Sequence, residues 1–143
     1  MSRLARKYGG SVPEVRVERV PVRSLLEVAV ENAVEGCVRE TYGAAVAAYQ
    51  GEWASDPGVR RVMRAIAVDE AEHASLGWSV DEWARSRLPA AERKIVDLAR
   101  ERARADLRLH IQRPIALELI SILGLPGPRA SAALVSALDP LWD

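Results

Sequence analysis

A glutamate and a histidine three residues apart, Glu70 and His73, are the residues of this sequence whose types and spacing best suit chemistry. On a helix they lie about one turn apart, so a carboxylate oxygen and an imidazole nitrogen point in similar directions. Mixed carboxylate and imidazole ligands suit iron and manganese. Helical bundles hold pairs of these metals with one Glu-x-x-His and one further glutamate from each helical hairpin. The spacing therefore predicts half of a dinuclear metal site.

The helix that carries this motif is predicted to turn it inward. At 100° per residue, Asp69, Glu70 and His73 fall within the apolar stripe of the helix. Burying a carboxylate and an imidazole without partners costs roughly several kcal/mol of folding free energy. We therefore expect a bound cation to compensate for them. Asp69 is expected to orient a ligand or an arginine. The alternative is a buried pair hydrogen-bonded to arginine or tyrosine groups. The apolar members of the stripe are Val59, Val62, Met63, Ile66, Leu76 and Val80.

The preceding apolar segment offers two candidates for the further glutamate ligand, Glu35 and Glu40. Glu40 lies close to the apolar stripe of its helix. Glu35 lies nearer the polar edge, but it reaches a depth between Glu70 and His73 when residues are counted outward from the loop. Periodicity favours Glu40, and the sequence leaves both open. The segment is also apolar on a second side, so Glu35 could face a surface made by another chain.

Two long helices are needed to position these residues. Ser24 and Glu27 form a capping-box pattern, which predicts a helix from there to about Gly51. Asp56 followed by Pro57 predicts the start of a second helix, which Pro89 ends. Since only about five residues join the two helices, they must run antiparallel, as a hairpin over 24–88.

The rest of the chain is predicted to complete an all-α helical bundle. The abundance of alanine and arginine and the absence of phenylalanine favour helix over strand. At 143 residues the chain fits one domain. We expect a short helix and an extended linker over 1–23, bracketed by Pro13 and Pro21, and a helical domain over 24–143. Its shorter C-terminal helices are expected within 90–138, at about 90–111, 115–123 and 129–138.

The composition of the chain limits the classes of function that it can have. Twenty basic and twenty acidic residues cancel, which argues against nucleic acid or an anionic membrane as the main partner. The single cysteine, Cys37, is expected to be a small core residue, and the chain has no apolar run of about 18 residues. A cytoplasmic location is therefore expected. The arginine-rich segment 85–113 is interpreted as a solvated helix face rather than a docking site for an acidic partner.

Three segments carry a resemblance to a known family: EGCVRET at 35–41, IAVDEAEHA at 66–74 and LGW at 76–78. Together they resemble the second half of bacterial ferritin-like domain proteins of the rubrerythrin and ferritin superfamily, over about residues 24–85. The resemblance implies a four-helix bundle with two iron or manganese ions and an oxidoreductase or iron-handling function. It assigns metal-ligand roles to Glu70 and His73, with either Glu35 or Glu40.

The sequence departs from that family in holding one such half only. The other histidine, His110, has Leu107 three residues before it, so a second Glu-x-x-His is missing. The segment 3–10 resembles the end of a preceding bundle helix, as though an upstream hairpin were absent. We therefore expect a homodimer or a second ferritin-like hairpin chain to complete the site. The alternative function is a non-catalytic helical interaction or dimerisation module that has lost metal binding.

Overall fold

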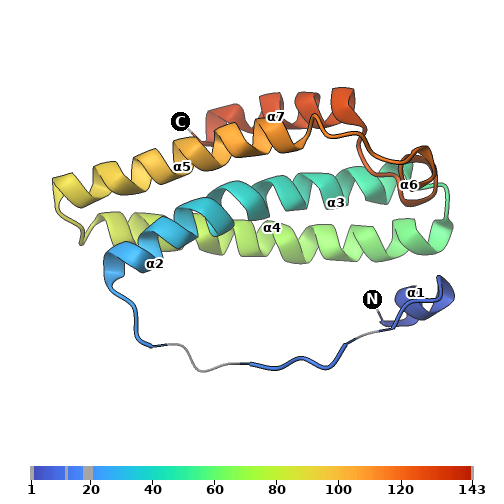
Figure 1. The fold of residues 1–143 in the computed structure, drawn as a ribbon, viewed down its shortest axis with the longest axis horizontal. Helices are drawn as coiled ribbons and strands as arrows, with labels where there is room; N and C mark the ends of the chain where they lie inside the picture. Colours follow the sequence, from blue (N-terminus) through green and yellow to red (C-terminus); the bar gives the residue numbers. More distant parts are fainter. Residues whose placement is uncertain (1, 12, 18–20, 143) are drawn as a thin grey trace.

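The computed structural model describes residues 2–11, 13–17 and 21–142, and the regular structure in this part of the chain is entirely helical. The prediction of an all-α fold is confirmed. Figure 1 shows a long antiparallel hairpin, one further long helix beside it, and shorter helices at the two ends of the chain. The elements in chain order are α1 (Ser2–Lys7), α2 (Leu25–Asn32), η1 (Ala33–Glu40), α3 (Thr41–Trp53), α4 (Pro57–Arg85), α5 (Ala90–His110), α6 (Leu117–Leu123) and α7 (Pro128–Trp142).

Both predicted starts of the hairpin helices are confirmed by their caps. The Ser24 amide donates to Glu27 Oε2 at 2.8 Å, and the Glu27 amide donates to Ser24 Oγ at 3.2 Å. At the second start, Asp56 Oδ1 accepts from the amides of Gly58 and Val59, with proline at the first helical position. These side chains satisfy amide donors that have no partner within their own helix. The hairpin α2–η1–α3 against α4 thus begins where the sequence predicts.

The first arm of the hairpin is not a uniform α-helix. Its middle third, η1, is a π-helix of eight residues between α2 and α3. A π-helix closes i→i+5 hydrogen bonds, has more residues per turn than an α-helix, and is often found at functional sites. Residues after η1 therefore lie at different angles from those that a constant 100° step predicts, and this affects the placement of Glu40.

The two arms approach closely where two glycines meet. A Cβ atom added to Gly77 of α4 would lie 2.8 Å from the carbonyl carbon of Gly36 in η1. Small side chains continue the same interface on both sides, with Ala33 and Ala84 fully buried. Close contact between backbones fixes the separation of η1 and α4, and hence the distance between side chains that face each other across it.

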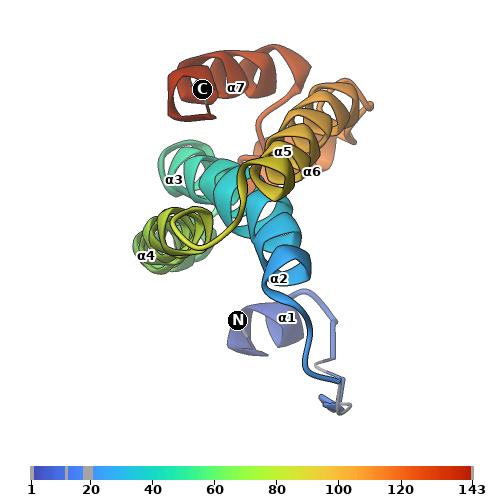
Figure 2. The ribbon, with the colours of Figure 1, turned by 90° about the vertical axis from the view of Figure 1, so that its left-hand side faces the viewer.

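The helices that follow the hairpin in the chain pack on the arm formed by α2, η1 and α3. In Figure 2, α4 and α5 lie on different sides of the α2–α3 arm, and α7 lies above that arm. α5 contacts α2 and η1, while α7 contacts α3. One core cluster joins the open end of the hairpin to α5 through Ala29, Ala33, Ala84, Leu88 and Val96. A second joins η1, α5 and α7 through Val38, Ala103, Ile111, Val135 and Trp142.

The C-terminal end differs from the prediction. We expected the last helix to end near residue 138, but α7 continues through Pro140 to Trp142. The reason is burial, because Trp142 is 2% exposed and its indole nitrogen donates to the carbonyl of Cys37 at 2.9 Å. None of the helices in the described ranges is by itself long and apolar enough to cross a membrane. By length and composition alone, α6 and α7 would pass that test together across their 60° bend.

The N-terminal segment reaches the turn of the hairpin. Tyr8 donates through its hydroxyl to Asp56 Oδ2 at 2.7 Å, and Lys7 forms an ion pair with the same carboxylate. Between this contact and Ser24, the described residues 10, 11, 13–17 and 21–24 have neither helix nor strand, in line with the extended linker that was predicted. Asp56 thus caps α4 and also anchors the segment that follows α1.

Candidate metal centre

Three predicted ligands come together midway along the hairpin. Glu40 is the last residue of η1, and Glu70 and His73 lie one turn apart in α4. One carboxylate oxygen from each glutamate and one imidazole nitrogen lie within 4.8 Å of one another. Two oxygen donors and one nitrogen donor at this separation match the ligand types that iron and manganese take in helical bundles.

Glu35, the other candidate for the further glutamate, is engaged elsewhere. Its Oε1 lies 2.5 Å from Nη1 of Arg39, one turn further along η1. About half of its side-chain surface is exposed. Of the two candidates that the sequence leaves open, Glu40 is the one placed beside Glu70 and His73. Glu35 remains near enough for its charge to act on Glu40.

The carboxyl groups of Glu40 and Glu70 interact directly. The pKa of Glu40 is raised above its ordinary value, first by a hydrogen bond with the Glu70 side chain and then by partial burial and the negative charge of Glu70. His73 acts in the opposite direction. Two carboxyl groups this close repel each other when both are ionised, and either a proton or a cation would relieve that repulsion. Glu40 and Glu70 therefore form a pair that either a proton or a metal ion can neutralise.

His73 lies at the edge of this pair rather than in a core. Its Nδ1 is 3.5 Å from Glu70 Oε2, and 61% of its side chain is exposed. The prediction that the motif lies on a buried face of α4 is wrong for His73, and likewise for Leu76, which is 62% exposed. The reason is that α5 and α7 pack chiefly on the other arm of the hairpin, α5 on α2 and η1 and α7 on α3. The side that carries His73 has no covering helix among the described residues.

The rest of the predicted apolar stripe grades from buried to exposed. Val59 is buried near the hairpin turn, whereas Asp69 is exposed and forms no ion pair that would orient a ligand within the described part of the chain. Half-buried residues of the same stripe lie at heptad spacing with His73 and Leu76. They are Val62, Ile66 and Val80. This stripe gives α4 an apolar edge interrupted at its centre by the candidate ligands.

Sequence reasoning missed a second polar feature, an ion pair inside the bundle. Asp81 Oδ1 of α4 lies 2.7 Å from an Nη atom of Arg100 in α5, and both side chains are about nine-tenths buried. The Arg100 guanidinium also lies over the ring of Trp78. Asp81 occurs in a run of small α4 residues that face the hairpin partner, which is the one signal the sequence offered for a buried acid.

Cys37 lies beside this pair and is buried, as expected of a small core residue. Its pKa is raised to about 11, chiefly by burial and next by the charge of Asp81. A thiol with so high a pKa stays protonated near neutral pH, which makes it a poor nucleophile and a poor metal ligand. The chemistry of the hairpin therefore centres on Glu40, Glu70 and His73.

Comparison of the chain with protein-family models, with curated proteins and with solved structures finds no match.

Proposed function

We propose that this chain is a ferritin-like metal-binding protein in which Glu40, Glu70 and His73 form half of a dinuclear iron or manganese site. The observation that carries the proposal is the convergence of their three ligand atoms within 4.8 Å. Two facing carboxyl groups, one of them with a raised pKa, favour a divalent cation between them, since the cation removes their repulsion. The residue-level resemblance to ferritin-like hairpins points in the same direction.

A second chain is proposed to supply the other half. Three side chains cannot saturate two metal ions, so a working centre needs another copy of the hairpin or a different hairpin chain. The exposed side of α4 around His73 and Leu76 suits that contact, because it is apolar and α5 and α7 pack elsewhere (Figure 2). Burial of this side by a partner would give His73 the enclosed setting it lacks in the single chain.

Each ligand has a definite role in this proposal. The carboxylates of Glu40 and Glu70 supply negative charge to balance the cation, and His73 supplies a neutral nitrogen. Glu70 contacts both other ligands and so fixes their relative positions. When bound, iron or manganese would supply redox chemistry toward an oxygen species, consistent with an oxidoreductase or an iron-handling protein.

Metal analysis of the purified chain, combined with its mass in solution, tests the proposal. We expect about one iron or manganese ion per chain in a dimer, and loss of the metal in Glu70→Gln and His73→Ala. The chain offers matched controls in Glu72→Gln, on an exposed part of α4, and His110→Ala, the other histidine. A wild-type dimer that binds neither metal, or metal binding that survives both site variants, would refute it.

The alternative is a helical interaction module that has lost metal binding. It is favoured by one observation, the hydrogen-bonded Glu40–Glu70 pair, which can satisfy itself with a proton and needs no cation. In that case the same experiment yields a dimer without metal, and Glu70→Gln leaves the dimer intact.

A further inference from the structure

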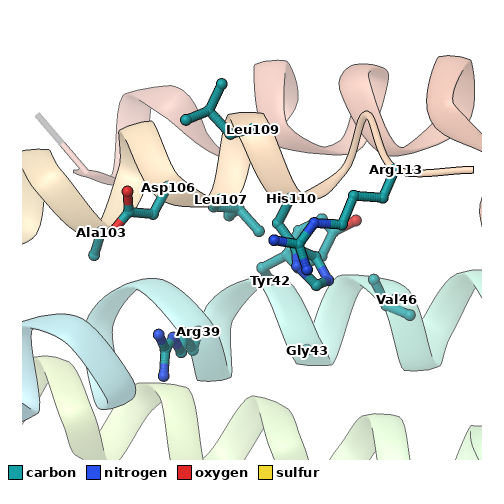
Figure 3. A pocket seen from close by; sticks show the side chains of 10 residues that line it. All are labelled: Arg39, Tyr42, Gly43, Val46, Ala103, Asp106, Leu107, Leu109, His110 and Arg113. Carbon is teal, nitrogen blue, oxygen red and sulfur yellow. The ribbon is translucent and has the colours of Figure 1, made fainter.

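A groove lies on another part of the bundle, between the C-terminal half of α5 and the arm formed by η1 and α3 (Figure 3). Its volume is about 570 Å³, within the range of about 300–1,000 Å³ typical of small-molecule sites. Its apolar lining comes from Val46 on α3 and from Ala103 and Leu107 on α5. The groove is separate from the candidate metal centre, since none of its lining residues is a proposed ligand.

The polar groups of the groove are distributed unevenly along it. In Figure 3, Tyr42, His110 and Arg113 lie toward one end, and Asp106 lies toward the other. Asp106 lies in the last turns of α5, and Arg113 lies just after the end of that helix at His110. One end of the groove therefore carries Arg113 with no acid in the lining beside it, and the other end carries Asp106, with Arg39 at its edge.

The end that carries Arg113 has hydrogen-bond donors to spare. Arg39, at the edge of the groove, is held by Glu35. By contrast, neither the guanidinium of Arg113 nor the hydroxyl of Tyr42 has a side-chain partner in the ranges that the structure describes. The guanidinium of Arg113 and the phenol of Tyr42 thus offer N–H and O–H donors at the same end of the groove, and a carboxylate accepts such donors with two oxygens.

We infer that this groove binds a free medium-chain carboxylate, with its head group at Tyr42 and Arg113 and its alkyl chain along Leu107 and Ala103. Charge complementarity selects the head group, because the charge of Arg113 is uncompensated while that of Arg39 is already paired. Asp106 disfavours the reverse orientation, in which the carboxylate would lie beside another carboxylate. The apolar lining selects a hydrocarbon body over a small hydrophilic anion such as phosphate.

The groove also contains a position at which it can be filled without disturbing the fold. A Cβ atom added to Gly43 would meet nothing within 4 Å. A leucine at this position would extend into the groove, and it favours helix more than glycine does. Gly43→Leu should therefore keep α3 intact and remove the space for an alkyl chain.

Isothermal titration of the metal-free protein with decanoate, below the concentration at which decanoate forms micelles, tests the inference. We expect saturable binding of one decanoate per chain, and no saturable binding of decyltrimethylammonium. Arg113→Gln should weaken decanoate binding by about tenfold or more, since a charge-assisted hydrogen bond is lost. Gly43→Leu should abolish binding. Arg102→Gln, on the exposed outer side of α5, is the matched control and should leave it unchanged.

Circular dichroism and urea midpoints of each variant separate loss of binding from loss of fold, and Arg113→Lys should retain part of the affinity because it keeps the charge. The inference is overturned if decanoate does not saturate the wild-type protein. It is also overturned if decanol binds as tightly as decanoate, or if the folded Gly43→Leu variant binds decanoate normally. Because no metal takes part, failure here leaves the metal-site proposal standing, and failure there leaves this one standing.

Discussion

Replacement of Gly77 by alanine should separate the two arms of the hairpin. The new Cβ would lie 2.8 Å from the carbonyl carbon of Gly36 and 2.9 Å from its Cα and oxygen. Since nonbonded carbon atoms prefer about 3.5 Å or more, the arms must move apart by roughly 0.7 Å. Backbone atoms on both sides leave no flexible side chain to absorb the shift.

The net effect on stability is the difference of two opposed terms. Forcing extra volume into a packed interface costs about 1–3 kcal/mol, whereas replacing a helical glycine by alanine gains about 1 kcal/mol. We therefore expect Gly77→Ala to lower the free energy of unfolding by about 1 kcal/mol and the melting temperature by about 3 °C. Gly43→Ala is the matched control, because its Cβ meets nothing within 4 Å. The Gly43→Ala variant should be more stable than the wild-type protein by up to about 1 kcal/mol.

Urea denaturation followed by circular dichroism measures both variants under the same conditions. Wider separation of η1 and α4 should also weaken binding of manganese, because Glu40 and Glu70 project from the two arms that move. If Gly77→Ala proves as stable as Gly43→Ala, the two backbones are not in contact and the argument from close approach is wrong.

Three further predictions concern charge and burial. Because the pKa of Glu40 is raised, the contribution of Glu40 to the stability of the metal-free chain should be largest below its ordinary pKa of 4.5 and should fall as pH rises through the higher folded-state value; Glu40→Gln should remove that part of the pH dependence in urea titrations from about pH 4 to about pH 8. Asp81→Ala should lower the free energy of unfolding by about 3 kcal/mol in the same assay, since it leaves Arg100 buried without its counter-charge; an effect under about 1 kcal/mol would mean that water reaches the pair. Cys37, with a pKa raised to about 11, should react with a disulfide reagent at pH 8 far more slowly in the native protein than in urea, and equal rates would show that the thiol is accessible.

The ends of the hairpin helices could be predicted because their signals are local. Ser24 and Glu27 satisfy each other and adjacent amides, and Asp56 with Pro57 does the same for α4, so neither cap depends on distant parts of the chain. The Glu-x-x-His spacing was likewise enough to place Glu70 beside His73. In each case a few neighbouring residues determine the geometry.

Features that depend on distant contacts were not predicted. A helical wheel shows that α4 has an apolar side, but not whether its own chain covers that side, so the exposure of His73 and Leu76 was missed. Periodicity favoured Glu40 over Glu35, but the sequence left the choice open, and it gave no sign of the π-helix η1 that carries both residues. The extension of α7 depended on a pocket for Trp142 that η1 and α5 create.

The interior pair of Asp81 and Arg100 has a consequence for how α5 finds its place. Alanines and glycines line much of the hairpin, and a smooth surface of this kind distinguishes poorly between one docking position and the next turn along. If α5 slid by one turn, about 5.4 Å, an acid and a base would each be left without a counter-charge away from water. The pair thus favours a single register of α5 on the hairpin, because it destabilises the shifted positions more than it stabilises the correct one.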